Sequence, residues 1–455
     1  MYFLYFSFLN YLIVFFVKVK ALKTFYFFIN ISVVFILLTV LYSCKKEIED
    51  IPKVSFIYPH ENTFYNVGDT VETKIKIESI SNIKSIEIKL VNNDLVPVSN
   101  NYNYKHDGSN NITVNYAFII NDYYMQSGDY QILCKVENEN DVKRKYQRIK
   151  INSVAKELEN IAVVCQSPGK VKVYNLTTGL TNSSLKFEVN GDYSSSTYLP
   201  FHHRFAIAGS VHGSMICWDY FTEDTIQIIP YSANPPFPFF SSLDGVNDFL
   251  AVGYYQGAVD LFNYTAFQKF SIAMETYYYP LKLFDLGEHF MINEKQINGD
   301  KNLISIRLSN TTSQYASLLL PGILLNAFPF ENNDDMLFFN DGNMGAIGKY
   351  VYQDNAINKL IMPYSEKFIS VAQIDKKNYL ISTATNLLWY QYQISSLTSI
   401  INNVSLENLH YDNVTGRLYA THGKTIDVYS IPNGNLLNSI TLSEEIAALH
   451  LIYNK

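Results

Sequence analysis

Between residues 52 and 153, apolar and polar side chains alternate in a series of short runs. In TKIKIES (73–79) and SIEIKLV (85–91), every second residue is apolar. This period buries one face of a β-sheet and exposes the other. Turn signals separate the runs, which are KVSFIYP, TVETKIKIES, IKSIEIKLV, NITVNYAFII, GDYQILCKVEN and KYQRIKINSV. Six or seven short strands in about 100 residues predict a β-sandwich over residues 52–153.

A different pattern starts near residue 155, where an apolar strand that ends at a large side chain and a polar turn recurs seven times. The large residues follow one another at separations of 44, 44, 44, 44, 42 and 37, and they are Tyr174, Trp218, Phe262, Ile306, Tyr350, Tyr392 and Tyr429. Further strand-like runs flank each of them, so the repeating unit contains four strands. Seven such units predict an all-β chain that ends in a seven-bladed β-propeller over residues 155–455.

The two ends of the repeat differ from its middle. The first unit, near Asn160, lacks an inner strand, whereas the chain finishes with a spare strand-like run, IAALHLIY at 446–453. Pairing of this run with IAVVC at 161–165 would complete the first blade and remove two unpaired strand edges. We therefore expect the C-terminal strand to close the ring.

The first 43 residues form an apolar leader. Three lysines precede twenty uncharged residues (24–43), and Cys44 stands between this run and the charged stretch KKEIED. A basic flank, an apolar run and a small residue follow one another in export signals. The alternative is an uncleaved membrane anchor, because twenty apolar residues can span a bilayer.

Composition narrows the classes of function. The formal net charge is −7, and the chain after residue 43 holds 32 basic against 42 acidic residues, so nucleic acid is not expected as a partner. Tyrosine is abundant, with 36 residues, which favours β structure. Apart from Cys44, the cysteines lie inside apolar runs, and we expect buried free thiols at Cys134, Cys165 and Cys217.

Catalytic signatures are absent from the sequence. No Gly-x-Ser-x-Gly, His-Glu-x-x-His, Cys-x-x-Cys or phosphate-binding glycine loop occurs. The pair His202 and His203 fits a solvated hairpin, and NDGNMG (340–345) fits a turn better than a metal loop. We therefore predict no catalytic residue, metal or cofactor. Channel-side carboxylates, namely Asp285, Asp375 and Asp412, keep an enzymatic site open, although turn positions explain them equally well.

One concentration of aromatic residues suggests a binding surface. In a propeller, the loops that enter each blade and the loops that join its second and third strands lie on the same face. On blades two to four this face collects Tyr198, His212, Tyr231, Phe237, Tyr254, Tyr255, Tyr277, Tyr278 and Tyr279. Exposed rings with hydroxyl groups suit sugars or peptides, and the ligand-binding candidates are His212, Tyr254, Tyr255, Tyr277, Tyr278 and Tyr279. The alternative is that these rings pack the blades together.

Several motifs resemble those of known families. Residues 41–44 (LYSC) resemble the lipobox of bacterial lipoproteins, and KKEIED resembles the segment that follows the lipidated cysteine in surface-exposed lipoproteins of the Bacteroidetes. This resemblance implies cleavage of a signal peptide (1–43), lipid on Cys44, a tether (44–51) and a place on the outer membrane. NVGDTVETKI and SGDYQILCKVEN resemble immunoglobulin-like or fibronectin-like modules, with Tyr130 in a tyrosine-corner-like position.

The repeat resembles WD-repeat and YVTN-type propellers, in which Trp218 and Asp219 would be the one Trp-Asp pair. Quinoprotein-type blades share the architecture, but their recurrent tryptophan motif is missing, so no quinone is expected. These resemblances imply a lipid-anchored envelope protein that binds a protein or glycan ligand through a propeller face. The alternative is a propeller enzyme of lactonase, lyase or glycosidase type with a site at the central channel.

Overall fold

The computed structural model describes residues 51–93, 95–98, 102–105, 109–123, 125–232 and 238–454. Apart from two short 3-10 turns, η1 (Pro200–His202) and η2 (Tyr392–Ile394), the regular elements of these residues are all β-strands. The all-β prediction is confirmed. The predicted leader and Cys44 lie outside the described residues.

Within the described ranges, no helix has the length and apolar character needed to cross a membrane. The chain divides into two compact units, and the boundary falls between Val154 and Ala155.

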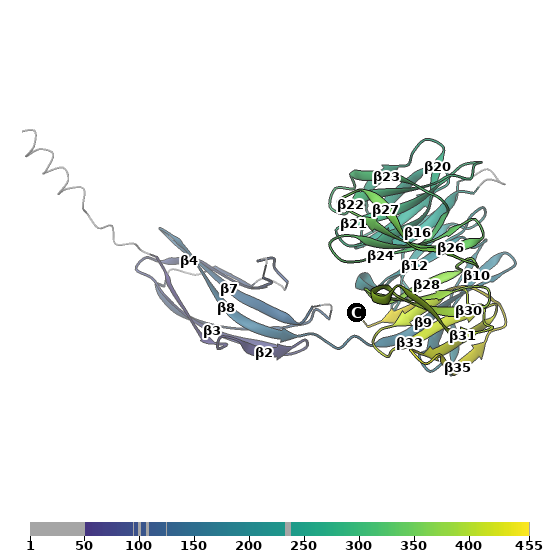
Figure 1. Cartoon of the computed structure of the whole chain (residues 1–455). Helices are drawn as coiled ribbons and strands as arrows, with labels where there is room; N and C mark the ends of the chain where they lie inside the picture. Colours follow the sequence, from purple (N-terminus) through teal and green to yellow (C-terminus); the bar gives the residue numbers. More distant parts are fainter. Residues whose placement is uncertain are drawn as a thin grey trace, which may run out of the picture. The chain divides into compact units, whose positions relative to one another are not determined.

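The first unit contains two sheets (Figure 1). The smaller is antiparallel with the order β1 (Lys53–Tyr58), β3 (Thr70–Glu78), β6 (Asn111–Ile119). The larger has the order β2 (Thr63–Asn66), β8 (Val142–Asn152), β7 (Gly128–Asn138), β4 (Ile83–Val91), β5 (Tyr102–Lys105), and its β2 and β8 run parallel. All six predicted runs form strands, and β2 and β5 are additional.

Alternation explains the core of this unit. Along β3, exposed and buried side chains alternate, and Val71, Ile75 and Ile77 are fully buried. They belong to the same hydrophobic cluster as Ile88 and Cys134 of the larger sheet, so one core serves both sheets. Each fully buried aliphatic side chain contributes about 1.5–3 kcal/mol, and this shared core therefore stabilises the unit.

The second unit consists of seven antiparallel sheets of four strands each. From outer to inner strand, the first sheet is β11 (Ser183–Asn190), β10 (Lys170–Thr177), β9 (Leu158–Ser167) and β36 (Glu445–Tyr453). The other sheets are given from inner to outer strand. The second is β12 (Ser195–Leu199), β13 (Arg204–Ala208), β14 (Met215–Asp219) and β15 (Thr225–Ile229), and the third is β16 (Phe240–Val246), β17 (Phe249–Tyr254), β18 (Ala258–Phe262) and β19 (Gln268–Ala273). The fourth is β20 (Tyr278–Asp285), β21 (His289–Gln296), β22 (Asn302–Leu308) and β23 (Gln314–Leu320). The fifth is β24 (Ile323–Pro329), β25 (Asp335–Asp341), β26 (Met344–Val351) and β27 (Ala356–Tyr364), and the sixth is β28 (Ser370–Asp375), β29 (Asn378–Ser382), β30 (Asn386–Gln391) and β31 (Ser396–Asn402). The seventh is β32 (Leu409–Asp412), β33 (Arg417–His422), β34 (Thr425–Ser430) and β35 (Asn435–Thr441).

The inner strands close these sheets into a ring. Each inner strand contacts the next one from β12 to β32, and β36 contacts both β32 and β12. The C-terminal strand β36 pairs antiparallel with β9, for example Leu449 with Val163. The predicted closure is therefore confirmed, and the second unit is a β-propeller. Asn454 secures the chain end through bonds to Glu157 N (3.0 Å) and Ala155 O (3.0 Å).

The repeated large residue has a structural cause. Trp218, Phe262 and Tyr429 each stand on the third strand of their blade at a shift in its pairing with the fourth strand. Such a bulge bends the outer strand and increases its twist, so the same position recurs from blade to blade. In the sixth blade the prediction was displaced, because Tyr392 lies in η2. Tyr390 on β30 pairs with the second residue of β29, as Trp218, Phe262 and Tyr429 pair with the second residues of their neighbouring strands.

Three cysteines lie in the cores of the two units. Cys134, Cys165 and Cys217 are free and buried, which confirms the prediction. Burial raises the pKa of each thiol to about 12. These thiols therefore stay protonated and unreactive at neutral pH.

Candidate functional site

The antiparallel blades place the loops of the propeller on two faces. The front face carries the loops that precede each inner strand and those that join second and third strands. The back face carries the loops that join first and second strands and those that join third and fourth strands.

The loop of residues 209–214 on the front face carries His212 between β13 and β14. One carboxylate fixes this loop: Asp192 accepts hydrogen bonds from the backbone N–H groups of Ser210 (3.2 Å), Val211 (2.8 Å) and His212 (2.9 Å). Burial alone would raise the pKa of Asp192, but these backbone donors outweigh burial and lower the pKa. The carboxylate therefore remains charged and keeps the loop in place.

Glycine makes this arrangement possible. A Cβ atom on Gly209 would lie 2.3 Å from the Cα atom of Gly213, and one on Gly191 would lie 2.6 Å from the same atom. Only residues without a side chain allow the two backbone segments to approach so closely. The position of His212 is thus set by backbone packing as well as by Asp192.

An open pocket of about 800 Å³ lies beside this loop, between the first two blades. It is lined by Gln166, Ser167, Pro168, Gly169, Asn190, Gly191, Asp192, His212 and Glu445. Tyr231 stands near the exposed His212 ring, with 6.3 Å between ring centroids. Amides, carboxylates and a hydroxyl in the lining can bind ligands rich in hydroxyl or N–H groups, whereas the two carboxylates would repel phosphates.

The predicted tyrosines lie on β17, on β20 and in the loops beside these strands. Tyr255 and Tyr279 contact one another with 4.5 Å between centroids and their rings tilted by 40°, and Tyr278 is half-buried. Tyr277 is 73% exposed and has a φ of 71°, a conformation that is rare for a bulky residue. Its carbonyl accepts a hydrogen bond from Ile297 N at 2.7 Å, which holds the turn that presents the ring.

Tyr254 differs from its neighbours. Its ring packs against Phe239 (5.4 Å) and Phe240 (5.7 Å), and burial raises the pKa of its phenol. The packing interpretation therefore describes Tyr254 well. The His212 ring has its aromatic contact with Tyr231. Ligand binding by any of these residues stays a prediction.

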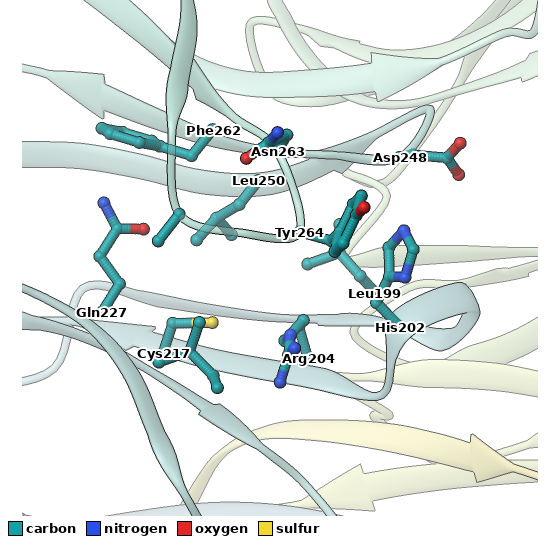
Figure 2. Close-up of a pocket in the computed structure, with 12 residues that line it drawn as sticks. Leu199, His202, Arg204, Cys217, Gln227, Asp248, Leu250, Phe262, Asn263 and Tyr264 are labelled. Carbon is teal, nitrogen blue, oxygen red and sulfur yellow. The ribbon is translucent and has the colours of Figure 1, made fainter.

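A crevice between the second and third blades lies on the back face (Figure 2). Its volume of about 10 Å³ holds roughly one water molecule. His202 stacks on Tyr264 at 4.6 Å, and burial lowers the pKa of His202 although Asp248 opposes the shift. His203 faces elsewhere and bonds to Tyr198 through Nδ1 (2.9 Å). Among the described residues no group of three potential metal ligands occurs, here or elsewhere.

The third cavity, of about 420 Å³, lies at the centre of the ring. It is lined by Lys156, Tyr198, Pro200, Gln373, Ile374, His410, Tyr411, Asn413, His450, Leu451 and Tyr453, which include residues of the inner strands β12, β28, β32 and β36. His450 Nε2 lies 2.8 Å from Ser196 Oγ, which lies 3.0 Å from the Tyr193 hydroxyl. The His410 ring is 6.2 Å from that of His450.

Burial shifts the pKa values of titratable residues on the inner strands. Burial lowers the pKa of His450 to about 3, and burial together with the Lys282 charge lowers that of His410 to about 4. Both rings are neutral at pH 7. Burial raises the pKa of Asp244 to about 6, although Lys282 and the Leu283 N–H (2.9 Å) oppose the shift. Burial also lowers the pKa of Lys282, although Asp244 opposes the shift and the side chain keeps solvent-accessible surface.

The carboxylates predicted to face the channel occupy turns at the ends of inner strands. Asp285 accepts bonds from Asn247 N (2.7 Å) and Gly287 N (3.0 Å), and Asp375 accepts one from Lys377 N (2.8 Å). Asp412 is fully buried and accepts a bond from the Tyr453 hydroxyl (3.0 Å). The turn explanation fits all three.

Sequence reasoning missed Asp244 and Lys282. Lys282 had a signal, since it is a charged residue within a largely apolar inner strand, YYPLKLFD, whereas Asp244 stands in FSSLDGV, which contains two serines. His410 in LHYD and His450 in IAALHLIY are likewise polar residues that follow a buried leucine on an inner strand.

No protein-family model and no curated relative matches the chain. Similar solved structures include a quinonprotein alcohol dehydrogenase-like protein from Bacteroides thetaiotaomicron, with 13% identity, a TM-score of 0.46 and alignment over 88% of this chain and 99% of that one. Others are Sqt1 from Saccharomyces cerevisiae (11%, 0.46, 64% and 84%) and the Pan2 WD40 domain from Neurospora crassa (8%, 0.45, 58% and 82%). At this level of similarity none of them carries an argument about function, and the strand order with its closed ring carries the propeller assignment.

Proposed function

We propose that the protein is a binding or scaffolding protein that engages a protein or glycan ligand through the front face of its propeller. The observation that carries this proposal is the loop of residues 209–214, which Asp192 and close glycine packing hold beside an open pocket of about 800 Å³. A loop that is fixed before the ligand arrives loses little conformational entropy on binding. His212 and Tyr231 add aromatic surface at its edge.

The lining of this pocket supports the two ligand classes. Asn190 and Gln166 offer amide donors and acceptors, and Asp192 and Glu445 accept hydrogen bonds from hydroxyl or N–H groups. Sugars and peptides carry such groups. The same carboxylates, together with the excess of acidic residues in the chain, argue against a nucleic-acid ligand.

We further propose that the protein is a lipoprotein of the bacterial cell envelope, exposed on the outer membrane, with lipid on Cys44. The order of basic flank, apolar run, Cys44 and KKEIED supports this location. For the first unit we propose an immunoglobulin-like sandwich that acts as a spacer. Its two sheets share one core, and the Tyr130 hydroxyl donates to Gln126 O at 2.9 Å, the backward bond of a tyrosine corner.

A pair of matched variants tests the front face. The variant His212→Ala/Tyr231→Ala removes a histidine and an aromatic ring from the front face. The control His202→Ala/Tyr264→Ala removes the same two residue types from the back face. We expect ligands captured on glycan and peptide arrays to bind at least tenfold more weakly to the front-face variant and unchanged to the control, with melting curves of both variants as a check on folding. Equal binding by the two variants would place the ligand elsewhere.

An enzyme is the second candidate, and the channel supplies the observation that favours it. His410 and His450 both line the cavity at the centre of the ring, where neutral imidazoles can take part in proton transfer. Turnover of a lactone or glycoside that disappears in His410→Gln would replace the binding proposal by this one.

A further inference from the structure

The cavity at the centre of the ring lies toward the back face of the propeller. Among its lining residues, Pro200 and Asn413 belong to loops that join first and second strands, and Tyr453 ends the inner strand β36. Its volume of about 420 Å³ falls within the usual range of small-molecule sites. It shares no lining residue with the front-face pocket, so a ligand in it would occupy a separate site.

Two histidines in the wall of this cavity keep hydrogen-bonding capacity. His450 Nε2 is bonded to Ser196 Oγ at 2.8 Å, which leaves Nδ1 of the ring for another partner. Neither ring nitrogen of His410 has a hydrogen-bond partner among the described residues. A neutral imidazole donates one hydrogen bond and accepts another. The two rings can therefore bond to ligand groups that both donate and accept.

The spacing of the two rings leaves room for one ligand atom between them. The centroids of the His410 and His450 rings lie 6.2 Å apart, and within the described part of the chain no hydrogen bond joins the two rings directly. This separation allows one oxygen atom to lie about 2.9 Å from a nitrogen of each ring. A hydroxyl group suits that position, because it can donate to one nitrogen and accept from the other.

The charges around the cavity favour an uncharged ligand. Both histidines are neutral at pH 7, chiefly because burial lowers their pKa values. Lys156, which lines the cavity, lies over the Tyr453 ring at 4.0 Å, and the hydroxyl of the same tyrosine donates to Asp412 at 3.0 Å. The two opposite charges therefore lie close to one tyrosine and offset each other there. A ligand with a net charge would gain little from this wall.

The rest of the wall combines aromatic and apolar side chains. Tyr198 and Tyr411 carry rings, and Pro200, Ile374 and Leu451 are apolar. Aromatic rings with hydroxyl groups present an apolar body together with a polar end. Sugars match such a wall, because they carry hydroxyl groups around a ring that also has apolar C–H faces.

We propose that the back-face end of the channel binds an uncharged hexose unit, one of whose hydroxyl groups lies between the rings of His410 and His450. The tyrosines and the apolar side chains of the wall contact the sugar ring. The site is independent of any ligand on the front face.

Titration of the full-length protein with sugars that differ in charge tests the ligand class. The probes are the neutral sugars D-glucose and D-galactose, the acids D-glucuronate and D-galacturonate, and the amines D-glucosamine and D-galactosamine. We expect at least one neutral sugar to shift the NMR resonances of the His410 and His450 rings and to bind at least tenfold more tightly than its two charged counterparts. No shift with either neutral sugar, or tighter binding of a charged counterpart, would overturn the proposal.

Variants separate the channel from the front face. His410→Phe keeps a ring but removes both nitrogens, so we expect it to bind the neutral sugar at least tenfold more weakly, whereas His410→Gln, whose amide donates and accepts, should bind it better than His410→Phe does. The control is His60→Phe, the same substitution at an exposed histidine of the first unit, which should bind as the wild type does. Two outcomes would overturn the channel site: unchanged affinity of a His410→Phe protein whose melting curve shows that it is folded, or loss of binding only in His212→Ala/Tyr231→Ala.

Discussion

The channel residues show how burial and charge oppose one another at the scale of single side chains. Asp244 ionises less readily in the folded chain than in the unfolded chain, since its pKa rises from 3.8 to about 6. The folded state then holds its proton longer, so stability falls as the pH rises through this window. The lowered pKa values of His410 and His450 make stability depend on pH in the opposite direction. His450 has a pKa of about 3 in the fold against 6.5 otherwise, so stability is lost as the pH drops from 6.5 toward 3.

Asp244→Asn should therefore stabilise the protein at pH 7. The amide keeps an oxygen that can accept the Leu283 N–H bond and removes the charge that burial disfavours. We expect the free energy of unfolding to rise by about 1–3 kcal/mol at pH 7 and by almost nothing at pH 4, where the carboxyl of Asp244 is protonated in the folded protein.

Urea denaturation at the two pH values measures this difference. Asp285→Asn, at a turn of the neighbouring inner strand, serves as the control. A variant that is less stable than the wild type at pH 7 would show that Asp244 is needed in its charged form.

At the scale of strands, most of the architecture could be predicted from the sequence. Alternation located β3 and β4, and the spacing of large residues located the blades because it follows the bulge on the third strand. The short strand β2 has only four residues and escaped detection, since a pattern of period two needs a longer run. For the sixth blade, the predicted large residue was Tyr392, which lies beyond the end of the third strand. The prediction missed Tyr390 because η2 adds a second tyrosine directly after β30.

The candidate site was less predictable than the strands. The loop of His212 could be placed on its face by propeller order, but the contact between Gly209 and Gly213 depends on folding. Asp244, Lys282, His410 and His450 come from four different blades, and only ring closure brings them into one channel. Sequence spacing does not report which inner-strand residues converge there.

Removal of residues 447–455 tests the closing strand. The deletion removes Leu449 and Ile452, both fully buried, and each buried aliphatic side chain contributes about 1.5–3 kcal/mol. It also leaves one edge of β9 unpaired. We expect loss of the cooperative melting transition, or a transition shifted strongly to lower temperature, in circular dichroism. The matched control removes residue 455 alone. Unchanged melting of the long truncation would mean that β36 is dispensable for closure.

At the scale of the whole molecule, the proposed lipid anchor would determine where the propeller meets its ligand. Each buried methylene group contributes about 0.8 kcal/mol, so two or three acyl chains on one cysteine hold a protein on a membrane where a single chain does not. Three buried thiols elsewhere in the chain have raised pKa values and would not compete for modification.

Mass spectrometry of the mature protein checks the anchor. We expect an N-terminal peptide that starts at Cys44 and carries diacylglycerol, and we expect Cys44→Ala to release the protein from the membrane fraction. Cys134→Ala is the control and should leave fractionation unchanged. A peptide that begins upstream of Cys44, or an unmodified Cys44, would refute the lipoprotein proposal.

The pairing of β36 with β9 makes completion of the first blade depend on strands from opposite ends of the second unit. A chain that stops before β36 cannot form this blade, so premature termination within the propeller leaves an open ring whose β9 edge is free to pair with other strands. Tyr453 also lines the channel cavity. An affinity tag fused to the C-terminus would thus crowd the mouth of that cavity, and purification handles belong in the N-terminal unit.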